Sequence, residues 1–334
     1  MVEKVFSTLL VLTQGTLYME VKLKVKRFNP EAQDGSYYQD FSVECQDHEM
    51  VLDALIRIRE YQDDSLAMRC SCRSAICGSC TMRINGHATL ACNTKITDAL
   101  ARTDTILIEP PGNMPVLKDL VVDFKLFWDK IRDVTPWLEP QGPPPEQEYI
   151  VDNSAMLGLN QVTGCIMCGA CVSDCTVLEV DKRFLGPAAL AKALRFVDDP
   201  RDDSNKDRLR KLVQVGGIWD CTHCFECVQV CPKGVAPMEQ ILELRRKAVD
   251  AGFTNHNGVR HSDSFAKSVK QSGWLNEVKL AVESFGYLNI PAQLSMLPTG
   301  LRALKAHKMP PLIHHKRPGA KSVKRIFERL EKKK

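Results

Sequence analysis

Apolar and polar positions alternate in two stretches near the start of the chain. Residues 21–26 carry valine or leucine at each odd position and lysine at each even position. Residues 41–45 alternate in the same way, after a turn around Gly35. This two-residue period is typical of strands with one buried face. Cys45 falls on the apolar side of the second strand, so it is predicted to be a small core residue rather than a ligand.

A helix and further strands are predicted after these two. Apolar residues recur at helical spacing over residues 50–61. Short strands are expected at 81–84 and 89–92, on either side of Asn85-Gly86, which is a hairpin turn signal. A strand at 105–109 would close the sheet.

The rest of the chain has a helical pattern and two linkers. Proline and glycine at 110–112 and 141–145 mark the linkers. Between Met156 and Val249 the apolar residues recur at helical spacing, with an amphipathic stretch at 187–197. Short helices are expected farther on, at 264–271, 275–285, 292–307 and 320–330.

Twelve of the 14 cysteines fall into three spaced sets. The first set has the plant-type spacing of a [2Fe–2S] cluster and consists of Cys72, Cys77, Cys80 and Cys92. Small residues between these cysteines let the backbone wrap closely around the cluster. The backbone amides can then point at the sulfurs and raise the reduction potential of the cluster. If Cys70 rather than Cys72 were the first ligand, the set would no longer have the plant-type spacing. Cys70 is therefore predicted to be a spare thiol that does not bind the cluster.

The other two sets are Cys-x2-Cys-x2-Cys-x3-Cys runs, which form an internal repeat. The fourth cysteine of such a run typically ligates the other cluster. One [4Fe–4S] cluster is therefore expected on Cys165, Cys168, Cys171 and Cys231, and a second on Cys221, Cys224, Cys227 and Cys175. His223 is interpreted as a surface residue, because four thiolates already complete its cluster. Structural zinc takes its ligands in pairs, and disulfide frameworks belong to small secreted domains, so both fit this chain less well.

These patterns predict an α+β protein with several parts. An N-terminal β-grasp ferredoxin domain of the plant type, with the [2Fe–2S] cluster, is assigned to residues 19–112. A connecting segment at 113–145 leads to an all-α two-cluster domain like bacterial ferredoxins at 146–250. A helical, basic C-terminal extension follows at 251–334. Residues 1–18 are interpreted as a disordered extension, or as an over-long start before Met19.

Charge is concentrated at the C-terminal end. From Leu301 onward twelve lysines and arginines face only Glu328 and Glu331, whereas the whole chain has a formal net charge of +4. The last predicted helix has an apolar stripe that suits packing on its own domain, an acidic partner helix or an anionic membrane surface. No stretch approaches the roughly 18 apolar residues that span a bilayer, and no signal-peptide cleavage site follows the start. A cytoplasmic location is therefore expected.

Several segments resemble the iron–sulfur subunit of succinate dehydrogenase/fumarate reductase. They are residues 71–80, 90–92, 113–123, 136–138, 184–188 and 199–202, and the resemblance extends over about residues 19–249. It implies the two domains described above and a separate FAD-bearing flavoprotein that interconverts succinate and fumarate. It also implies a peripheral position on the cytoplasmic face of the inner membrane, through partner subunits.

This chain departs from the family pattern in two ways. Most members lack a cysteine at the position of Cys224 and hold a three-iron cluster there, whereas a full set of thiolates here predicts a second [4Fe–4S] cluster; without Cys224 as a ligand it would be [3Fe–4S]. Quinone-reducing members carry proline and tryptophan where this chain has Thr176-Val177, and histidine in place of Thr222. The C-terminal region resembles heterodisulfide-reductase-type subunits, whose partner is rich in Cys-Cys-Gly motifs.

The leading functional prediction is an electron-relay subunit without a substrate site of its own. No dinucleotide-binding glycine loop follows a strand, and single-electron clusters suit the division of a flavin's two-electron step. The partners expected are the flavoprotein and a membrane-anchor or Cys-Cys-Gly-rich subunit. A thiol:fumarate or heterodisulfide reductase-like complex is the alternative. A nucleic-acid-binding protein is a remote one, because the basic tail lacks interleaved aromatics beyond Phe327.

Overall fold

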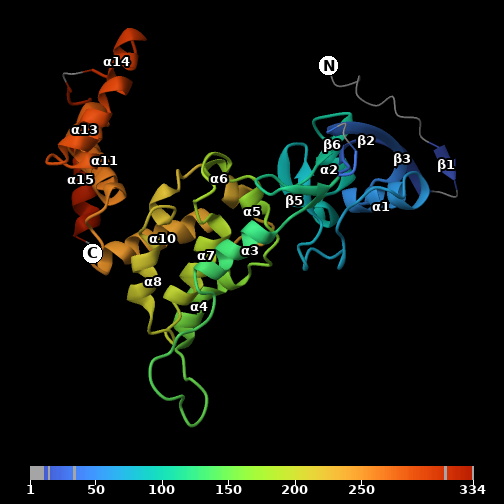
Figure 1. Cartoon of the computed structure of the whole chain (residues 1–334), viewed down its shortest axis with the longest axis horizontal. Coiled ribbons are helices and arrows are strands. Elements are labelled where there is room, and N and C mark those ends of the chain that lie inside the picture. Colours follow the sequence, from blue (N-terminus) through green and yellow to red (C-terminus); the bar gives the residue numbers. More distant parts are fainter. Residues whose placement is uncertain (1–10, 14–15, 33–34, 312–313, 333–334) are drawn as a thin grey trace. The chain divides into compact units, whose positions relative to one another are not determined.

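The computed structural model describes residues 11–13, 16–32, 35–311 and 314–332. It divides into two compact units, Met1–Arg245 and Arg246–Lys334. Figure 1 shows that a β-sheet occupies the N-terminal part of the first unit and that the remainder is helical. The α+β class expected from the sequence is therefore confirmed.

The sheet is built around one long strand, β2 (Thr16–Phe28). Antiparallel β3 (Ser36–Gln46) pairs with β2 on one side. On the other side β6 (Thr105–Glu109) runs parallel to β2 and continues the sheet to β4 (Thr81–Ile84) and then β5 (His87–Leu90). The parallel pair requires a crossover, and the intervening helix and hairpin provide it.

The predicted alternation decides which face of the sheet is buried. Val21, Leu23 and Val25 are fully buried, and the lysines between them are exposed. Helix α1 (Val51–Tyr61) contributes six buried residues to the same core. Cys45 also lies in this core, as its position in the alternating pattern predicted, and burial raises its pKa to about 11.

Two expectations for the N-terminal part are wrong. The strand expected at 89–92 is β5, two residues earlier, because the chain turns into a 3-10 helix η1 (Ala91–Asn93) that carries Cys92. Disorder, one of the two interpretations of residues 1–18, does not hold for β1 (Val11–Thr13), which pairs with the start of β2; the other, an over-long start before Met19, stays a prediction. Since β2 extends beyond the end of β6, its edge there is free to bind another strand. Residues 1–10 lie outside the described part of the chain.

A small hairpin and several helices complete the first unit. The hairpin consists of β7 (Val116–Lys118) and β8 (Val121–Val122). The helices are α2 (Ile96–Leu100), α3 (Lys125–Asp133), α4 (Asn153–Thr163), α5 (Ala170–Ser173), α6 (Thr176–Val180), α7 (Pro187–Val197), α8 (Asn205–Leu212), the 3-10 turn η2 (Ile218–Asp220), α9 (Glu226–Gln229) and α10 (Pro237–Asp250), which continues into the second unit from Arg246 on. Helix α7 has the predicted bounds and is buried along most of its length, so it forms the core around which the others pack.

The second unit contains α11 (Asn257–Ser272), α12 (Glu277–Phe285), α13 (Ile290–Ser295), α14 (Leu297–Lys305) and α15 (Ala320–Glu331). Helix α11 begins earlier than expected, where His256 caps its first turn. The single helix expected at 292–307 is wrong: the chain forms α13 and α14 instead. Pro298 has no N–H to continue the hydrogen bonds of α13, but it fits the first turn of a new helix. Among the described residues, no helix is long and apolar enough to cross a membrane.

Candidate iron–sulfur cluster sites

The loop between α1 and β4 directs backbone amides at the sulfurs of the first cysteine set. The amides of Ser74, Ile76 and Cys77 lie 3.4, 3.4 and 3.2 Å from Cys72 Sγ. The amide of Ala75 lies 3.3 Å from Cys92 Sγ. This donor set is what a cluster with thiolate ligands needs, because N–H groups aimed at the sulfurs stabilise their negative charge. The residues present therefore fit a [2Fe–2S] cluster.

The four thiols of this loop have different environments. The Ser79 hydroxyl lies 2.9 Å from Cys77 Sγ and is the main cause that lowers the pKa of Cys77 to about 6. Burial raises the pKa of Cys80 to about 12. Iron requires the thiolate form, so cluster binding must displace the proton of Cys80. Cys70, the spare thiol of the sequence prediction, lies half-buried against the core of the sheet.

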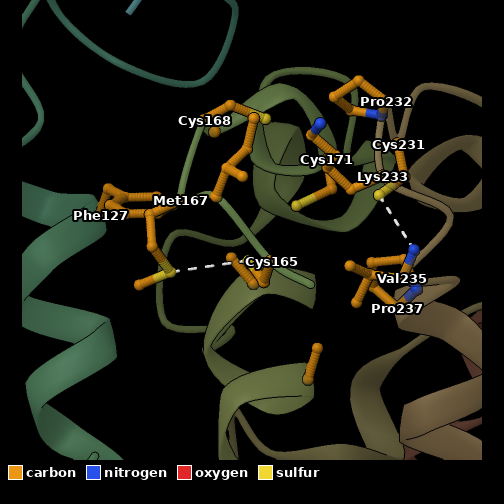
Figure 2. A pocket seen from close by; sticks show the side chains of 14 residues that line it. Phe127, Cys165, Met167, Cys168, Cys171, Cys231, Pro232, Lys233, Val235 and Pro237 are labelled. Atoms are coloured by element: carbon orange, nitrogen blue, oxygen red, sulfur yellow. Dashed lines mark hydrogen bonds between the residues drawn. The ribbon is translucent and has the colours of Figure 1, made fainter. Parts of the chain in front are cut away.

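One cavity in the helical part is surrounded by Cys165, Cys168, Cys171 and Cys231. Figure 2 shows these four side chains around a common space, beside Met167 and Phe127. Apolar residues of α4 and α7 pack against Cys165 and Cys231, and the Val235 amide lies 3.3 Å from Cys231 Sγ. Burial, together with the neighbouring thiols, raises the pKa of Cys171 well above its usual value.

The remaining four cysteines line a second cavity. Cys175 comes from the first run, and Cys221, Cys224 and Cys227 come from the second. Phe184, Met238 and Ile241 complete the apolar wall. Burial, and secondly the nearby Cys221, raise the pKa of Cys227 to about 12. Both cavities thus bring together three cysteines of one run and the last cysteine of the other.

The two runs have the same backbone shape. The residue before the second cysteine is left-handed in both, with φ of 56° at Met167 and 58° at His223. The residue after the second cysteine is also left-handed, with φ of 79° at Gly169 and 67° at Phe225. A one-turn helix follows each time, α5 or α9. Cys224 therefore occupies the same place in its loop as Cys168 does in the first.

Asn113 holds the segment that carries Cys175. Its side-chain amide donates to the carbonyls of Val172, Ser173 and Cys175 at 2.9, 3.1 and 3.0 Å. Lys182 donates in turn to Asn113 Oδ1 at 2.9 Å. Sequence reasoning did not assign Asn113 a role, because its partners lie about sixty residues away along the chain. Its left-handed φ of 62° is not visible in the sequence either.

Arg245 holds the loop of the second run and was also missed. Its guanidinium donates to the carbonyls of Ile218 and Cys221 at 2.8 and 2.9 Å, and it lies 5.1 Å from the centre of the Trp219 ring. It also contacts His223, whose ring is exposed. A lysine could not make these planar contacts together.

The sheet and the helical part are joined beside the first cavity. Asp174 Oδ2 accepts a hydrogen bond from the Ala88 amide at 2.7 Å and pairs with Arg83. The Gly112 amide donates to Ser173 Oγ at 2.8 Å. These contacts place the hairpin of β4 and β5 against α5, so the [2Fe–2S] loop lies next to the first four-cysteine cavity.

Exposure differs along this row of three sites. At one end, Ile76 is 64% exposed and Cys77 is also exposed. In the middle cavity none of the four cysteines is exposed. At the other end Cys224 is exposed and Phe225 is 50% exposed. One cysteine of the first site and one of the last are therefore exposed, whereas the four cysteines of the middle site are all half-buried.

Comparison with known proteins matches both halves of this arrangement. A family model described as "2Fe-2S iron-sulfur cluster binding domain" matches residues 22–129. A second, described as "4Fe-4S dicluster domain", matches residues 161–235. The prediction of one [2Fe–2S] domain followed by a two-cluster [4Fe–4S] domain is thereby confirmed.

Similar proteins cover most of the chain. The 8-methylmenaquinol:fumarate reductase iron-sulfur subunit of Wolinella succinogenes is 33% identical over 300 residues, which are 87% of this chain and 92% of that protein. The fumarate reductase iron-sulfur subunit of Mycobacterium tuberculosis is 39% identical over 230 residues, 68% of this chain and 92% of that protein. A chain of the solved Mycobacterium smegmatis Sdh1 complex in the apo form is similar with a TM-score of 0.62 and 26% identity, covering 70% of this chain and 97% of that one.

Proposed function

This chain belongs to the iron–sulfur subunits of succinate dehydrogenase and fumarate reductase, and we propose that its three cysteine sets carry electrons in a fixed spatial order. It is an electron-transfer subunit of an oxidoreductase. In the proposed order the [2Fe–2S] cluster on Cys72, Cys77, Cys80 and Cys92 comes first. A [4Fe–4S] cluster on Cys165, Cys168, Cys171 and Cys231 follows, and another on Cys175, Cys221, Cys224 and Cys227 comes last.

The observation that carries this order is the exposure pattern of the row. A relay must exchange electrons with other proteins at its ends and must protect the centre from solvent and oxidants. Ile76 and Cys77 are exposed at the first site, and Cys224 and Phe225 at the last. The four cysteines of the middle site are all half-buried, so none of them is exposed as Cys77 and Cys224 are.

We assign a different partner to each end. The FAD-bearing flavoprotein, which acts on succinate or fumarate, would contact the [2Fe–2S] loop. A membrane-anchor or Cys-Cys-Gly-rich subunit would contact the loop of Cys224. Through these partners the protein would lie at the cytoplasmic face of the inner membrane. When bound, the clusters would supply the one-electron steps, and the loop amides would stabilise the thiolates that hold them.

The second [4Fe–4S] assignment rests on Cys224. Its loop repeats the backbone of the first run, so that its thiol has the same relation to the cavity as Cys168. The exposed Thr222 stands beside it where quinone-reducing members have histidine. We therefore favour electron exchange with a further subunit over a quinone pocket on this chain.

The test is anaerobic purification of the complex, followed by iron analysis and low-temperature EPR. The proposal expects one two-iron and two four-iron clusters, all reducible by succinate through the flavoprotein. A stoichiometric three-iron signal that iron addition does not remove would contradict the third site. Reduction by dithionite but not by succinate would contradict the order.

A thiol-linked complex remains the second candidate, favoured by the threonines at 176 and 222 and by the C-terminal unit. It predicts that a Cys-Cys-Gly-rich subunit co-purifies and that a thiol couple, rather than a quinol, exchanges electrons with the complex. Assaying the purified complex with both donors separates the two.

A further inference from the structure

The C-terminal unit buries small residues and exposes large ones. Among its described residues from Asn257 onward, the buried ones are Val259, Ser264, Ser268, Ser272 and Ala320. The serines of α11 hydrogen-bond to neighbouring segments, as Ser264 does to Glu283 at 2.5 Å. Such a core removes little apolar surface from water. The large apolar side chains of this unit stay exposed and are available to pack against something other than this unit.

The exposed apolar residues gather on two consecutive helices. Helices α13 and α14 contain no buried residue. Leu288, just before α13, is 95% exposed, and Leu301 in α14 is 66% exposed. The other exposed apolar residues of this face are Ile290, Leu294, Met296, Leu297 and Leu304. Figure 1 shows α14 at the opposite end of the unit from α15, which packs against α11. We call residues 288–305 the aliphatic face.

Helix α14 is amphipathic. Leu297, Leu301 and Leu304 are spaced by four and three residues, so they lie on one side of α14. Arg302 and Lys305 lie beside that stripe. Aliphatic side chains next to long basic ones, on helices too short to span a bilayer, suit a position in the plane of a membrane surface.

The charge of this region has one sign. Between Glu283 and Glu328 there is no acidic residue, and eight lysines and arginines occur there. The surface of a folded protein partner carries charges of both signs, and acidic residues on this segment would help to fix its position against the basic ones. An anionic bilayer presents negatively charged headgroups above acyl chains. A segment that has lysines and arginines but no carboxylates is attracted to such a surface and meets no like-charge repulsion there. The aliphatic face contains no Phe or Trp, and the exposed Tyr287 that directly precedes it is of a type that is also enriched at membrane–water interfaces.

We propose that the aliphatic face of α13 and α14 binds the surface of an anionic phospholipid membrane. The leucines would enter the headgroup–acyl boundary, and Arg302 and Lys305 would contact the lipid phosphates. This inference rests on the proposed function only in that it places the relay at a membrane. It requires no particular cluster or electron partner.

Vesicle flotation of the purified full-length chain, kept anaerobic, tests the proposal. Vesicles of phosphatidylcholine with phosphatidylglycerol are compared with phosphatidylcholine alone, at low and high salt. Binding is expected to the anionic vesicles and to weaken with salt. Leu301→Gln with Leu304→Gln should weaken it about tenfold or more, and Arg302→Gln with Lys305→Gln about tenfold.

The matched control changes two aliphatic residues of similar exposure on another helix of the unit, with Ile326→Gln and Leu330→Gln on α15. This control should bind vesicles as the unaltered chain does. Equal losses in the control, or no binding to anionic vesicles, would overturn the proposal. If the α14 variants instead release a co-purifying subunit while vesicles never bind, the face is a protein interface. Succinate-to-dye electron transfer, which tests the relay itself, should not change in any variant.

Discussion

Gly78 and Cys168 approach each other so closely that no side chain fits at Gly78. A methyl group there would lie 2.7 Å from Cys168 Cβ and 2.9 Å from its Cα. Gly78 also has a left-handed φ of +71°, which glycine adopts at little cost. Gly78 belongs to the [2Fe–2S] loop and Cys168 to the middle cysteine set, so this contact sets the separation of the first two sites in the row.

We expect Gly78→Ala to separate these two sites. Left-handed strain and the clash together should destabilise the folded protein by about 2–4 kcal/mol, and electron transfer from the [2Fe–2S] to the [4Fe–4S] site should slow. Rapid-freeze EPR after mixing with succinate measures that step. Gly86→Ala, at a turn with open space around the glycine, is the control for backbone strain alone. Equal slowing in both variants would count against the close contact as the cause.

Cys224→Ser should convert the last site to a three-iron cluster. Serine removes one thiolate while the backbone of the loop, set by His223 and Phe225, stays the same. EPR of the oxidised, anaerobic protein should then show a three-iron signal that the unaltered protein lacks. Retention of the original spectrum would mean that Cys224 is not a ligand.

Asn113→Ala should loosen the last site without affecting the first. The carbonyls of Val172, Ser173 and Cys175 each lose one donor, while those of Val172 and Cys175 keep a backbone donor. The loss of a hydrogen bond of this kind costs about 1 kcal/mol. We expect easier loss of iron and a changed EPR spectrum from the site of Cys175, Cys221, Cys224 and Cys227. Lys182→Met removes only the support of Asn113 and should have a smaller effect. Loss of the [2Fe–2S] signal instead would place the role of Asn113 elsewhere.

Arg73→Glu should slow reduction of the clusters by succinate without loss of iron. Arg73 is exposed on the [2Fe–2S] loop beside Ile76, where we place the flavoprotein. Reversing an exposed interface charge mainly affects association, so the defect should depend on salt. Arg102→Glu, also exposed in this part of the chain, is the matched control. Unchanged kinetics in the Arg73 variant would argue for another docking face.

Asp199 should make the stability of the helical part depend on pH between about 4 and 2. It is fully buried, and Arg201 and Arg195 donate to its carboxylate at 2.7 and 2.8 Å. Hydrogen bonding by Arg201 is the main cause that lowers its pKa to about 2. The folded pKa lies below the unfolded value near 3.9, so the stabilisation is complete above about pH 4 and is lost as the pH falls through 2.

Asp199→Asn should accordingly cost about 2 kcal/mol at pH 7, and its urea midpoint should approach that of the unaltered protein toward pH 2. A pH-independent difference between the two proteins would mean that the carboxylate charge is not the stabilising feature. Asp181→Asn is the control, because Asp181 pairs with Arg183 at the surface, where ion pairs contribute little.

The local elements of this protein follow from its sequence because their causes are local. The alternation around Leu23 and the Asn85-Gly86 turn specify strands and a hairpin through neighbouring residues. Cysteine spacing specifies the kind of cluster, since a hook of thiols around a metal centre is a local geometry. The family followed from the same residues, because its motifs surround those cysteines. Helix breaks were less predictable: Pro298 divides α13 from α14, although the apolar pattern runs through it.

Only the tertiary structure decided how the three sites are connected. The hydrogen bonds from the Asn113 side chain to the Cys175 carbonyl, and from the Ala88 amide to the Asp174 carboxylate, join residues about sixty and ninety positions apart. The close contact of Gly78 with Cys168 depends on two loops meeting, and neither loop's own pattern encodes that approach. The exposure of Cys224 and of the aliphatic face depends on what the rest of the chain covers. Sequence by itself therefore determined which chemistry this protein carries, because ligand type and spacing are local properties. The order and access of the sites required the fold, because distance and burial are properties of the packed molecule.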